Sequence, residues 1–433
     1  MINVGLIGFG TVGTGTARIL LENKELLKNR IGFEINLKKI ATRDVRKDRG
    51  IKVPKGMLTP DVNSVIEDPD IQIVAELVGG ISPAKEFILR AIGNGKHVVT
   101  ANKALLATEG MEVFTAAQNA AVEIGFEASV AGGIPIIKVM REGLVANRIK
   151  AVYGIINGTS NYILTKMTEE NVEFSVALRE AQKLGYAEAD PTLDVEGIDS
   201  AHKLAILAYL AYGMPFPFKD IYIEGISGIT PQDINFASDL GYKVKLLAIT
   251  KEADGEIELR VHPTMIPKNY LISQVDGPFN AVYIDGDATG STLYYGKGAG
   301  AMPTGSAVVS DIVNIARDIV KNAAERIPVV VKPLSDVRIR NMNDVSSMYY
   351  FRFSALDRPG VLSKISGILG NCNISIASVI QKGRRVGEAV PLVVLTHEAR
   401  ESDVRRAIQE IDRLPVVMDK TVFIRVEDRE QYG

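Results

Sequence analysis

Hydrophobic and polar positions follow three different patterns along the chain, and each pattern predicts a different kind of domain. Up to about residue 130, short β-branched runs such as INVGLIG and KHVVTA alternate with helical stretches such as TVGTGTARILLENKELL. This alternation is the sequence form of a parallel sheet covered by helices. We therefore predict an α/β domain at residues 1–131.

The middle of the chain has helical patterns first and longer alternating strands afterwards. YKVKLLAIT and IELRVHP are two of these strands. The order predicts an α+β domain with an open sheet, which we place at residues 132–302.

The last part of the chain has the pattern of a small module with its own core. From about residue 347 it alternates strand, helix, strand, strand, helix and strand, in the runs MYYFRFSAL, GVLSKISGILG, ISIASVIQ, EAVPLVVLTH, ESDVRRAIQEID and TVFIRVE. A βαββαβ order of this size predicts a ferredoxin-like fold at residues 347–427. The small polar residues of NMNDVSS predict a linker in front of it.

Composition restricts the class of partner. The chain has 433 residues with 50 basic and 52 acidic side chains, so nothing favours electrostatic binding to nucleic acid or to an anionic membrane. Small molecules are the expected partners. The single cysteine, Cys372, excludes an intrachain disulfide and fits a reducing compartment. The first residues do not read as a signal peptide, and LAILAYLAYG is too short for the ~20 residues of a membrane span. We expect a cytoplasmic protein.

The first motif with chemical meaning is GFGTVG, which runs from Gly8 to Gly13. It follows a predicted strand directly and opens a predicted helix, which is the context of a dinucleotide-binding turn. Gly8 permits the tight turn, Gly10 lets the backbone approach a pyrophosphate, and Gly13 allows the helix to pack closely on the strand. The alternative is an ordinary glycine turn between a strand and a helix.

The end of the second predicted strand bears on the choice between NAD and NADP. An acid at that position would bind the ribose 2′-hydroxyl, whereas an arginine would accept a 2′-phosphate. The strand ends in Ala41-Thr42-Arg43, and Arg46 and Lys47 follow closely. This favours NADP, with NAD as the second choice, unless the basic residues only solvate a surface loop.

The absence of certain residue types excludes some classes of nicotinamide-dependent reaction. Aldehyde oxidation through a thiohemiacetal needs a cysteine beside the nicotinamide, and Cys372 belongs to the C-terminal module. A zinc-dependent alcohol dehydrogenase needs a cluster of Cys and His ligands, whereas the four histidines occur singly. Lys, Asp, Glu or Tyr must therefore supply the acid and the base.

The stretch YAEADPTLDVEGIDSAHK, residues 186–203, concentrates acidic side chains and then ends on a lysine. Asp199 and Lys203 are four residues apart, so they share one face of a helix predicted to begin near Glu196. An exposed pair of this kind would contribute only about 0.3–0.5 kcal/mol. The residues that follow, LAILAYLA, are apolar on every face and predict a buried helix. Charges at the start of a buried helix need partners or a ligand, which makes this stretch a candidate site.

Six motifs occur together in one order: GFGTVG, HVVTANKALL, FEASVAGGIPI, INGTSNYILTKM, GYAEADPTLDVEGIDSAHK and GKGAGAMPTGSAVVSDI. In this combination the chain, from residue 1 to about 325, resembles homoserine dehydrogenases. These enzymes interconvert L-homoserine and L-aspartate 4-semialdehyde with a nicotinamide cofactor. The tail, YFRFSALDRPGVLSKISGIL, resembles an ACT domain, which is an amino-acid-sensing module.

The resemblance implies roles for the polar residues. Lys203 would donate a proton to the aldehyde oxygen, and Lys103 would be the second lysine at the reacting centre. Glu188 and Asp199 would hold the ammonium group of the amino acid and order the site. The rest of the substrate pocket would be formed by Tyr186, Asp194, Gly158 and Thr159.

The resemblance also implies binding positions for the cofactor and a cation. The cofactor would contact Gly8, Phe9, Gly10, Thr11, Val12, Gly13, Arg43, Thr100, Lys103, Gly185 and Gly300. Gly300 would close over the nicotinamide, and the helix at about 303–325 would pack back onto the first domain. Glu127, with the backbone carbonyls of Val130, Gly132 and Ile134, would bind Na⁺ or K⁺ through oxygen ligands. A glycine turn before a helix explains these glycines equally well, but not the glutamate.

Regulation and assembly are implied by the tail. L-Threonine, the end product of the pathway, would be the effector and would meet the DRPGVL turn at a subunit interface, so we expect a homodimer or homotetramer. A purely structural dimerisation unit is the alternative. Two other functions stay open, a non-catalytic sensor of NADP and an amino acid, and an oxidoreductase for another amino-acid semialdehyde or hydroxy acid. The presence of Lys103, Glu188, Asp199 and Lys203 argues against a sensor, because a sensor has no need of a proton donor.

Overall fold

The computed structural model describes residues 1–215, 218–323, 326–328, 338–381 and 388–428. The chain forms two compact units, and each is assembled from separate stretches of sequence. The first unit contains Met1–Gly158, Ile198–Ile221 and Pro278–Asp336, and the second contains Thr159–Gly197, Tyr222–Gly277 and Val337–Gly433. Across these described ranges, no helix has both the length and the apolar character that crossing a membrane requires.

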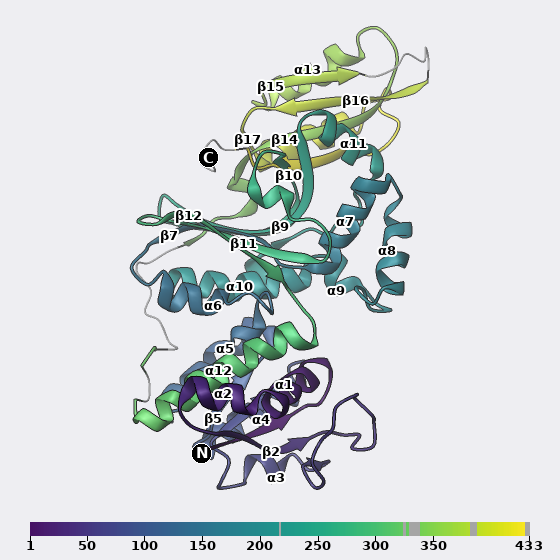
Figure 1. Cartoon of the computed structure of the whole chain (residues 1–433). Coiled ribbons are helices and arrows are strands. Elements are labelled where there is room, and N and C mark those ends of the chain that lie inside the picture. Colours follow the sequence, from purple (N-terminus) through teal and green to yellow (C-terminus); the bar gives the residue numbers. More distant parts are fainter. Residues whose placement is uncertain (216–217, 324–325, 329–337, 382–387, 429–433) are drawn as a thin grey trace. The chain divides into compact units, whose positions relative to one another are not determined.

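A six-stranded parallel sheet in the order β3-β2-β1-β4-β5-β6 is the centre of the first unit (Figure 1). This order confirms the predicted α/β domain, because it is the arrangement of a dinucleotide-binding Rossmann fold. The strands are β1 (Ile2–Ile7), β2 (Ile35–Ala41), β3 (Leu58–Thr59), β4 (Ile73–Glu76), β5 (His97–Thr100) and β6 (Ile124–Gly125). The helices between them are α1 (Thr11–Glu22), α2 (Lys24–Ile31), α3 (Asn63–Ile66), α4 (Ala84–Gly93) and α5 (Lys103–Asn119).

Helix α12 (Ala301–Lys321) joins this sheet from far along the chain. Its apolar face, including Val308 and Ile312, shares one buried cluster with Val4 of β1 and Leu20 of α1. The two helices meet backbone to backbone, because a Cβ atom at Gly15 would lie 1.9 Å from the carbonyl oxygen of Ala301. The start of α12 is thereby held beside the glycine turn of α1.

The rest of the first unit carries a small antiparallel sheet in the order β7-β11-β12. Its strands are β7 (Ile149–Ile155), β11 (Phe279–Gly286) and β12 (Gly290–Lys297). Helix α10 (Ile198–Tyr212) packs against α5 and β7, and it is buried on nearly all sides, as the apolar run predicted. Short helical turns complete the unit: η1 (Glu127–Ser129), α6 (Ile136–Lys138), η2 (Val139–Gly143) and η3 (Phe218–Asp220).

The second unit is built on a sheet in the order β9-β10-β18-β14-β16-β15. The strands are β9 (Tyr242–Ala253), β10 (Glu256–Pro267), β14 (Ser346–Leu356), β15 (Ile376–Gln381), β16 (Ala389–Thr396) and β18 (Val422–Val426), with short strands β8 (Tyr222–Ile223), β13 (Arg338–Ile339) and β17 (Ala399–Arg400) beside them. Helices α7 (Gly158–Glu170), α8 (Phe174–Lys183), α9 (Thr192–Val195) and α11 (Pro231–Asp239) and the turn η4 (Leu271–Gln274) come from the middle of the chain.

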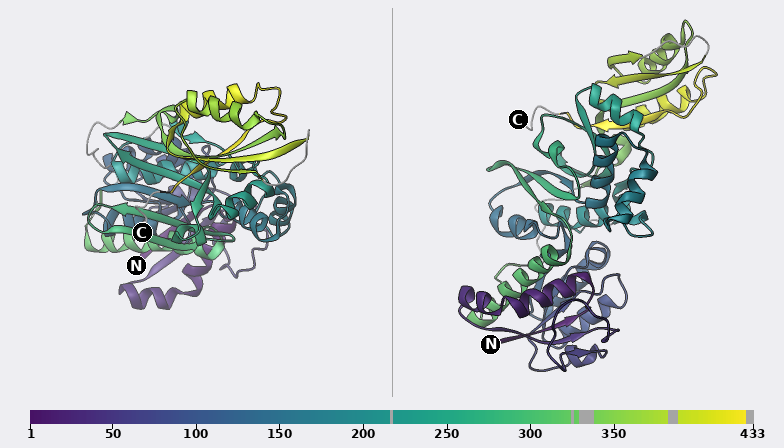
Figure 2. Two further views of the ribbon diagram at one scale, coloured as in Figure 1. Left: turned by 90° about the horizontal axis from the view of Figure 1, so that it is seen from above. Right: turned by 45° about the vertical axis from the view of Figure 1, so that its right-hand side comes forward.

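The C-terminal module has the predicted βαββαβ order. Helices α13 (Val361–Asn371) and α14 (Glu401–Ile411) cover one face of its four strands, as Figure 2 shows, and share a core with Tyr349 and Phe351 of β14. The segment NMNDVSS is folded and is not an open linker: Met342–Asp344 form the turn η5, Val345 is buried, and β14 begins at Ser346.

Candidate active site

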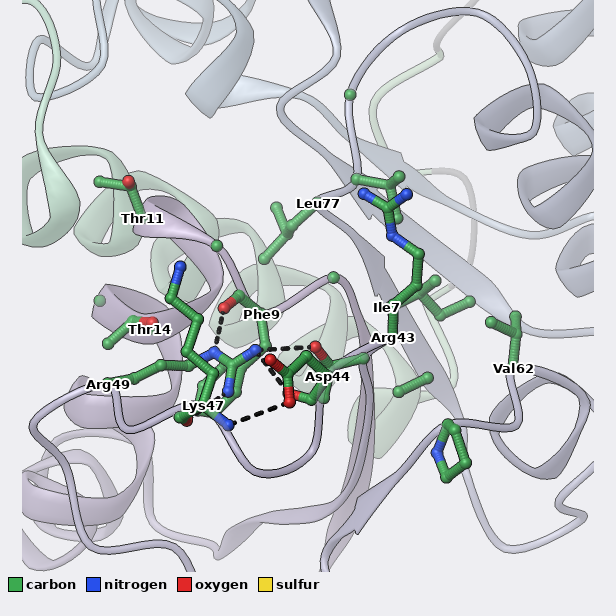
Figure 3. A pocket seen from close by; sticks show the side chains of 18 of the residues that line it. Ile7, Phe9, Thr11, Thr14, Arg43, Asp44, Lys47, Arg49, Val62 and Leu77 are labelled. Carbon is green, nitrogen blue, oxygen red and sulfur yellow. Dashed lines mark hydrogen bonds between the residues drawn. The ribbon is translucent and has the colours of Figure 1, made fainter.

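A cleft of about 1140 Å³ lies in the first unit where the carboxyl ends of β1, β2 and β4 meet (Figure 3). This is the point at which the strand order reverses, where α/β sheets bind their ligands. The lining includes Gly8, Phe9, Gly10, Thr11, Arg43, Asp44, Lys47, Arg49, Leu77 and Ala301. Of the other expected cofactor residues in this unit, Val12, Gly13, Thr100, Lys103 and Gly300 do not line the cleft, although Gly300 directly precedes Ala301.

Each glycine of the turn is required for a different steric reason. Gly8 has φ +104°, and a Cβ there would lie 2.6 Å from the carbonyl carbon of Leu77. A Cβ at Gly13 would lie 2.3 Å from the carbonyl oxygen of Gly8, so this glycine lets α1 pack on the turn. Gly10 has open space around its Cβ position, which leaves room for a phosphate at the start of α1.

Three basic residues of the loop after β2 line the cleft, and two of them, Arg43 and Lys47, are available to a ligand. In Figure 3, Arg43 and Lys47 rise on either side of Phe9, and within the described ranges neither side chain has a hydrogen bond or ion pair. An acid does follow the strand, one residue after Arg43, but the Asp44 carboxylate accepts hydrogen bonds from the backbone N–H groups of Arg46 (2.9 Å) and Lys47 (3.1 Å). Asp44 therefore shapes the loop itself.

Arg49 holds this loop against the glycine turn. Its guanidinium donates to the carbonyl oxygens of Phe9 (2.6 Å), Lys47 (2.7 Å) and Asp44 (2.9 Å) and to the hydroxyl of Thr42 (3.0 Å). It also lies over the Phe9 ring, 4.7 Å from the centroid. Arg49 carries no signal in the sequence, because nothing in a basic surface loop distinguishes an arginine that binds backbone carbonyls from its neighbours.

The two candidate lysines meet on one buried carboxylate. Lys203 donates from Nζ to Oδ2 of Asp199 at 2.7 Å, and Lys103 Nζ lies 2.6 Å from Oδ1. The amide of Asn157 donates to Oδ2 at 2.8 Å, and Lys203 also donates to the carbonyl oxygen of Ile156 at 2.7 Å. Burial alone would raise the pKa of Asp199, but the two lysines lower it well below its ordinary range. Asp199 is thus an ionised anchor that fixes both ammonium groups.

Lys103 is placed by the start of α5. The side chain of Asn102 caps that helix by accepting from the N–H of Leu105 at 3.2 Å, and it donates to the carbonyl oxygen of Gly80 at 2.6 Å. The hydroxyl of Thr100 donates to the buried carboxylate of Glu76 at 2.8 Å and accepts from the N–H of Asn102 at 3.1 Å. Thr100 therefore does not contact Lys103 but helps to position it, by fixing the backbone of the preceding residue. The sequence did not predict Glu76 as the partner of Thr100.

Comparison with known proteins agrees with this chemistry. Residues 135–313 match the homoserine dehydrogenase family model, residues 8–127 match the NAD-binding domain of homoserine dehydrogenase, and residues 349–416 match the ACT domain. The chain is 47% identical over 429 residues to a homoserine dehydrogenase from Neisseria gonorrhoeae, covering 98% of both chains. It belongs to the homoserine dehydrogenase family. It is therefore an NAD(P)-dependent oxidoreductase that acts on a CH–OH group and interconverts L-homoserine and L-aspartate 4-semialdehyde.

Solved structures of this family have the same fold. A homoserine dehydrogenase from Thiobacillus denitrificans is 49% identical, with a TM-score of 0.93 over 100% of this chain and 99% of its own. A hyperthermophilic archaeal homoserine dehydrogenase in complex with NADPH is 28% identical, with a TM-score of 0.61. That structure matches over 97% of its own length but over only 73% of this chain.

The remaining substrate residues expected from the homoserine dehydrogenase pattern belong mainly to the second unit. Gly158 ends the first unit and begins α7, whereas Thr159, Tyr186, Glu188 and Asp194 lie in the second. The hydroxyl of Thr159 donates to the carbonyl oxygen of Tyr186 at 2.5 Å, and Ser160 donates to that of Asp194 at 2.8 Å. The Glu188 side chain is exposed. Gly185 also lies in the second unit, with φ +77°, and is not part of the cofactor cleft described above.

The residues expected to bind a cation form a tight turn. The buried Glu127 carboxylate accepts from the backbone N–H groups of Ile137 (2.9 Å) and Lys138 (2.8 Å), so it caps α6. Burial raises its pKa to about 7. Within the described residues, no hydrogen bond reaches the carbonyl oxygens of Val130 and Gly132, while that of Ile134 accepts from Ile136. Backbone carbonyls of this turn therefore fit a hard cation better than the glutamate side chain does.

Proposed function

We propose that Lys203 is the proton donor and acceptor of the reaction and that NADPH is the preferred cofactor. The observation that carries the proposal is the pair of ammonium groups on the buried carboxylate of Asp199, 2.7 Å and 2.6 Å from its two oxygens. A bound nicotinamide supplies the hydride for the aldehyde carbon. The remaining chemistry is a proton transfer, which this pair of lysines can perform.

The geometry of Lys203 supports a role in proton transfer. As hydride reaches the aldehyde carbon, negative charge develops on oxygen, and a nearby ammonium stabilises that charge and then gives up a proton. Asp199 and the carbonyl oxygen of Ile156 hold the Nζ of Lys203 in one place, so little reorganisation is needed. In homoserine oxidation the neutral amine takes the proton back.

The contacts of Asp199 favour a positioning role for it. Both of its oxygens already accept from the chain's own donors, Lys103, Lys203 and Asn157, so about three of its four acceptor positions are taken. Glu188 is exposed, and within the described residues its carboxylate has no partner. We therefore assign recognition of the homoserine ammonium to Glu188, with Tyr186, Asp194, Gly158 and Thr159 as further pocket residues.

Arg43 and Lys47 support the choice of NADPH. Both side chains are exposed at the cleft, and in the part of the chain that the structure describes neither has a hydrogen bond or an ion pair. An arginine fork binds a phosphate through two donors at once. The homoserine dehydrogenase solved with NADPH shows that a member of the family binds this cofactor. NADH remains a weaker cofactor in the proposal.

The proposed accessory ligands are a monovalent cation and an amino-acid effector. The carbonyl turn at Val130 and Gly132 would hold Na⁺ or K⁺. L-Threonine would bind the ACT module, where a hollow of about 220 Å³ lies beside Asp357, Arg358 and Gly360 at the start of α13. We further propose a cytoplasmic homodimer or homotetramer.

The test is an NADPH oxidation assay with L-aspartate 4-semialdehyde beside an aldehyde of equal length that lacks the amino group. We expect turnover of the semialdehyde and at least ~100-fold lower kcat/KM for the other aldehyde, because an ion pair with Glu188 would be lost. Equal turnover would remove amino-acid recognition from the proposal. Binding of NADPH without turnover of any aldehyde would support the alternative of a sensor.

A further inference from the structure

Asn280 has a buried carboxamide that the established chemistry does not use. It lies on β11, its residue is only 1% exposed, and in the described part of the chain neither its Nδ2 nor its Oδ1 has a hydrogen-bond partner. Burying an unsatisfied donor or acceptor costs on the order of 1–3 kcal/mol, and an apolar residue of the same shape would avoid that cost. A carboxamide in such a position therefore requires an explanation.

Gly298 leaves the space that the Asn280 carboxamide occupies, and Gly158 lies at ordinary contact distance from it. A Cβ atom at Gly298 would lie 2.1 Å from Cγ of Asn280 and at nearly the same distance from its Nδ2 and Oδ1. The backbone of Gly298 therefore lies flat over the face of the carboxamide. A Cβ atom at Gly158 would lie 3.5 Å from Oδ1 of Asn280 and only 2.8 Å from the carbonyl oxygen of Pro278. A side chain at Gly298 would displace the carboxamide of Asn280, and one at Gly158 would press on the backbone of Pro278.

Asn280 also lies between the two parts of the reaction site that the first unit contributes. Ala281, the next residue, pairs with Ile155 of β7. The carbonyl oxygen of Ile156, just beyond that pair, accepts the hydrogen bond from Lys203. On the other side, Gly298 belongs to the loop that enters α12, whose first residue, Ala301, lines the cofactor cleft.

We propose that Asn280 is a ligand-contacting residue of this reaction. Its carboxamide forms hydrogen bonds with a bound group that offers both a donor and an acceptor, once the glycine-rich loop at Gly298 draws back from its face. Two ligands of the reaction carry such a group, the carboxamide of nicotinamide and the ammonium–carboxylate end of homoserine. Because the hydrogen-bonding partner is part of the ligand, the carboxamide is unpaired and destabilising in the free enzyme. Hydrogen bonds to the bound ligand offset that free-energy cost.

The decisive variant is Asn280→Leu, which keeps the approximate shape and removes both polar atoms. We expect the thermal midpoint of the free enzyme to stay the same or rise, because no hydrogen bond is lost. We expect kcat/KM to fall by ~10- to 100-fold, corresponding to the loss of two hydrogen bonds to bound ligand. A higher KM for NADPH, with weaker NADPH binding in a fluorescence titration, identifies the nicotinamide. A higher KM for homoserine alone identifies the amino acid.

Asn161→Leu is the matched control for stability. Asn161 is equally buried, but its amide donates to the carbonyl oxygens of Val275 (3.0 Å) and Gly277 (2.9 Å), and its oxygen accepts from Lys245 (3.2 Å). We expect this variant to lose thermal stability. If Asn280→Leu lost stability in the same way, or failed to fold together with Asn280→Ser, the carboxamide would have partners in the free enzyme and the proposal would be overturned. Unchanged kinetic constants in Asn280→Leu would overturn it as well.

Discussion

The two lysines that share the carboxylate of Asp199 differ in burial and in their other contacts. Lys203 is held by Asp199 and by the carbonyl oxygen of Ile156, and its side chain is only 10% exposed. Lys103 contacts Asp199 from the first position of α5 with 41% of its side chain exposed. A fixed, buried ammonium suits proton transfer, whereas the more exposed lysine suits electrostatic support and contact with ligands.

Replacing Lys203 tests that assignment. Lys203→Ala should lower kcat by ~10²–10⁴ while leaving NADPH binding nearly unchanged, because only the general acid is lost. Homoserine oxidation by the unaltered chain should become faster towards alkaline pH as the amine loses its proton. Steady-state rates from pH 7 to 10 and a fluorescence titration with NADPH check both statements. Full activity of the variant, or a flat profile, would exclude Lys203 from proton transfer.

Cofactor choice is also decided at single residues. Arg43→Ala should raise the KM for NADPH by ~10- to 100-fold and change that for NADH little, because a charge-assisted pair with the 2′-phosphate is lost. Arg46→Ala is the control, since it removes the same charge from the same loop outside the cleft lining. Arg49→Met should weaken both cofactors, because the loop loses its anchor on Phe9. Equal effects of Arg43→Ala on NADPH and NADH would show that Arg43 does not recognise the phosphate.

At the scale of elements, strand β18 joins the C-terminal module to hairpin β9–β10. Thr264 and Met265 of β10 pair in parallel with Arg425 and Val426 of β18. Just past this pairing, Glu427 is buried and accepts from Lys251 and from Arg260, both at 2.6 Å. These buried charges satisfy one another, so the pairing depends on keeping Glu427 ionised.

The ion pairs of Glu427 predict an acid-sensitive contact. Burial would raise the pKa of Glu427, but Lys251 and Arg260 lower it from an ordinary value of 4.5 to about 2. A carboxylate with a lowered pKa stabilises the fold above its unfolded pKa, and that contribution is lost as the pH falls from about 4.5 to about 2. Thermal midpoints across this window should fall steeply.

Glu427→Gln separates this effect from general acid denaturation. The variant should be less stable than the unaltered chain at pH 7, because two buried cations lose their counter-charge. Its stability should then change less between pH 4.5 and pH 2, since the titrating group is gone. An acid dependence as steep as that of the unaltered chain would show that Glu427 does not control it.

At the scale of the whole molecule, the C-terminal module has a core of its own and also forms buried hydrogen bonds and ion pairs with the middle of the chain. Arg352 on β14 donates to both oxygens of Asp233 on α11, at 2.6 Å and 3.0 Å, and Tyr350 donates to the same carboxylate at 3.1 Å. Asp233 is fully buried. These contacts give an effector on the module a physical route to α11, provided that it binds one arrangement more tightly than another.

Truncation after Asn341 tests the regulatory role of the module. The shortened chain should keep its kcat, because none of the proposed catalytic residues is removed, and should lose any inhibition by L-threonine. It should also have a lower thermal midpoint, since Arg260, Lys251 and Asp233 lose buried partners. Initial rates with millimolar L-threonine and thermal scans of both chains check this. If the unaltered chain ignores threonine and related amino acids, light scattering should show that truncation changes the subunit count.

Much of this organisation was determined by the sequence itself. Alternating strands and helices, the glycine turn at Gly8 and the βαββαβ pattern are local, because a dihedral preference or an apolar face depends on residues close in the chain. The link between Asp199 and Lys203 belongs to the same class, since four residues on a helix share one face. These patterns were sufficient to predict the fold class, whereas the family followed from the resemblance of six motifs to homoserine dehydrogenases.

Only the tertiary structure decided which distant residues share a contact. Lys103 reaches Asp199, Arg49 ties its loop to Phe9, Glu427 neutralises Arg260, and Gly298 covers Asn280. The first three contacts join segments that are far apart in the chain, and the fourth joins a strand to the loop that follows the next strand. In none of the four does one segment carry a local signal of the other. Hydrogen bonds and buried charges depend on distances of a few ångströms, and those distances exist only after the sheets and helices have packed.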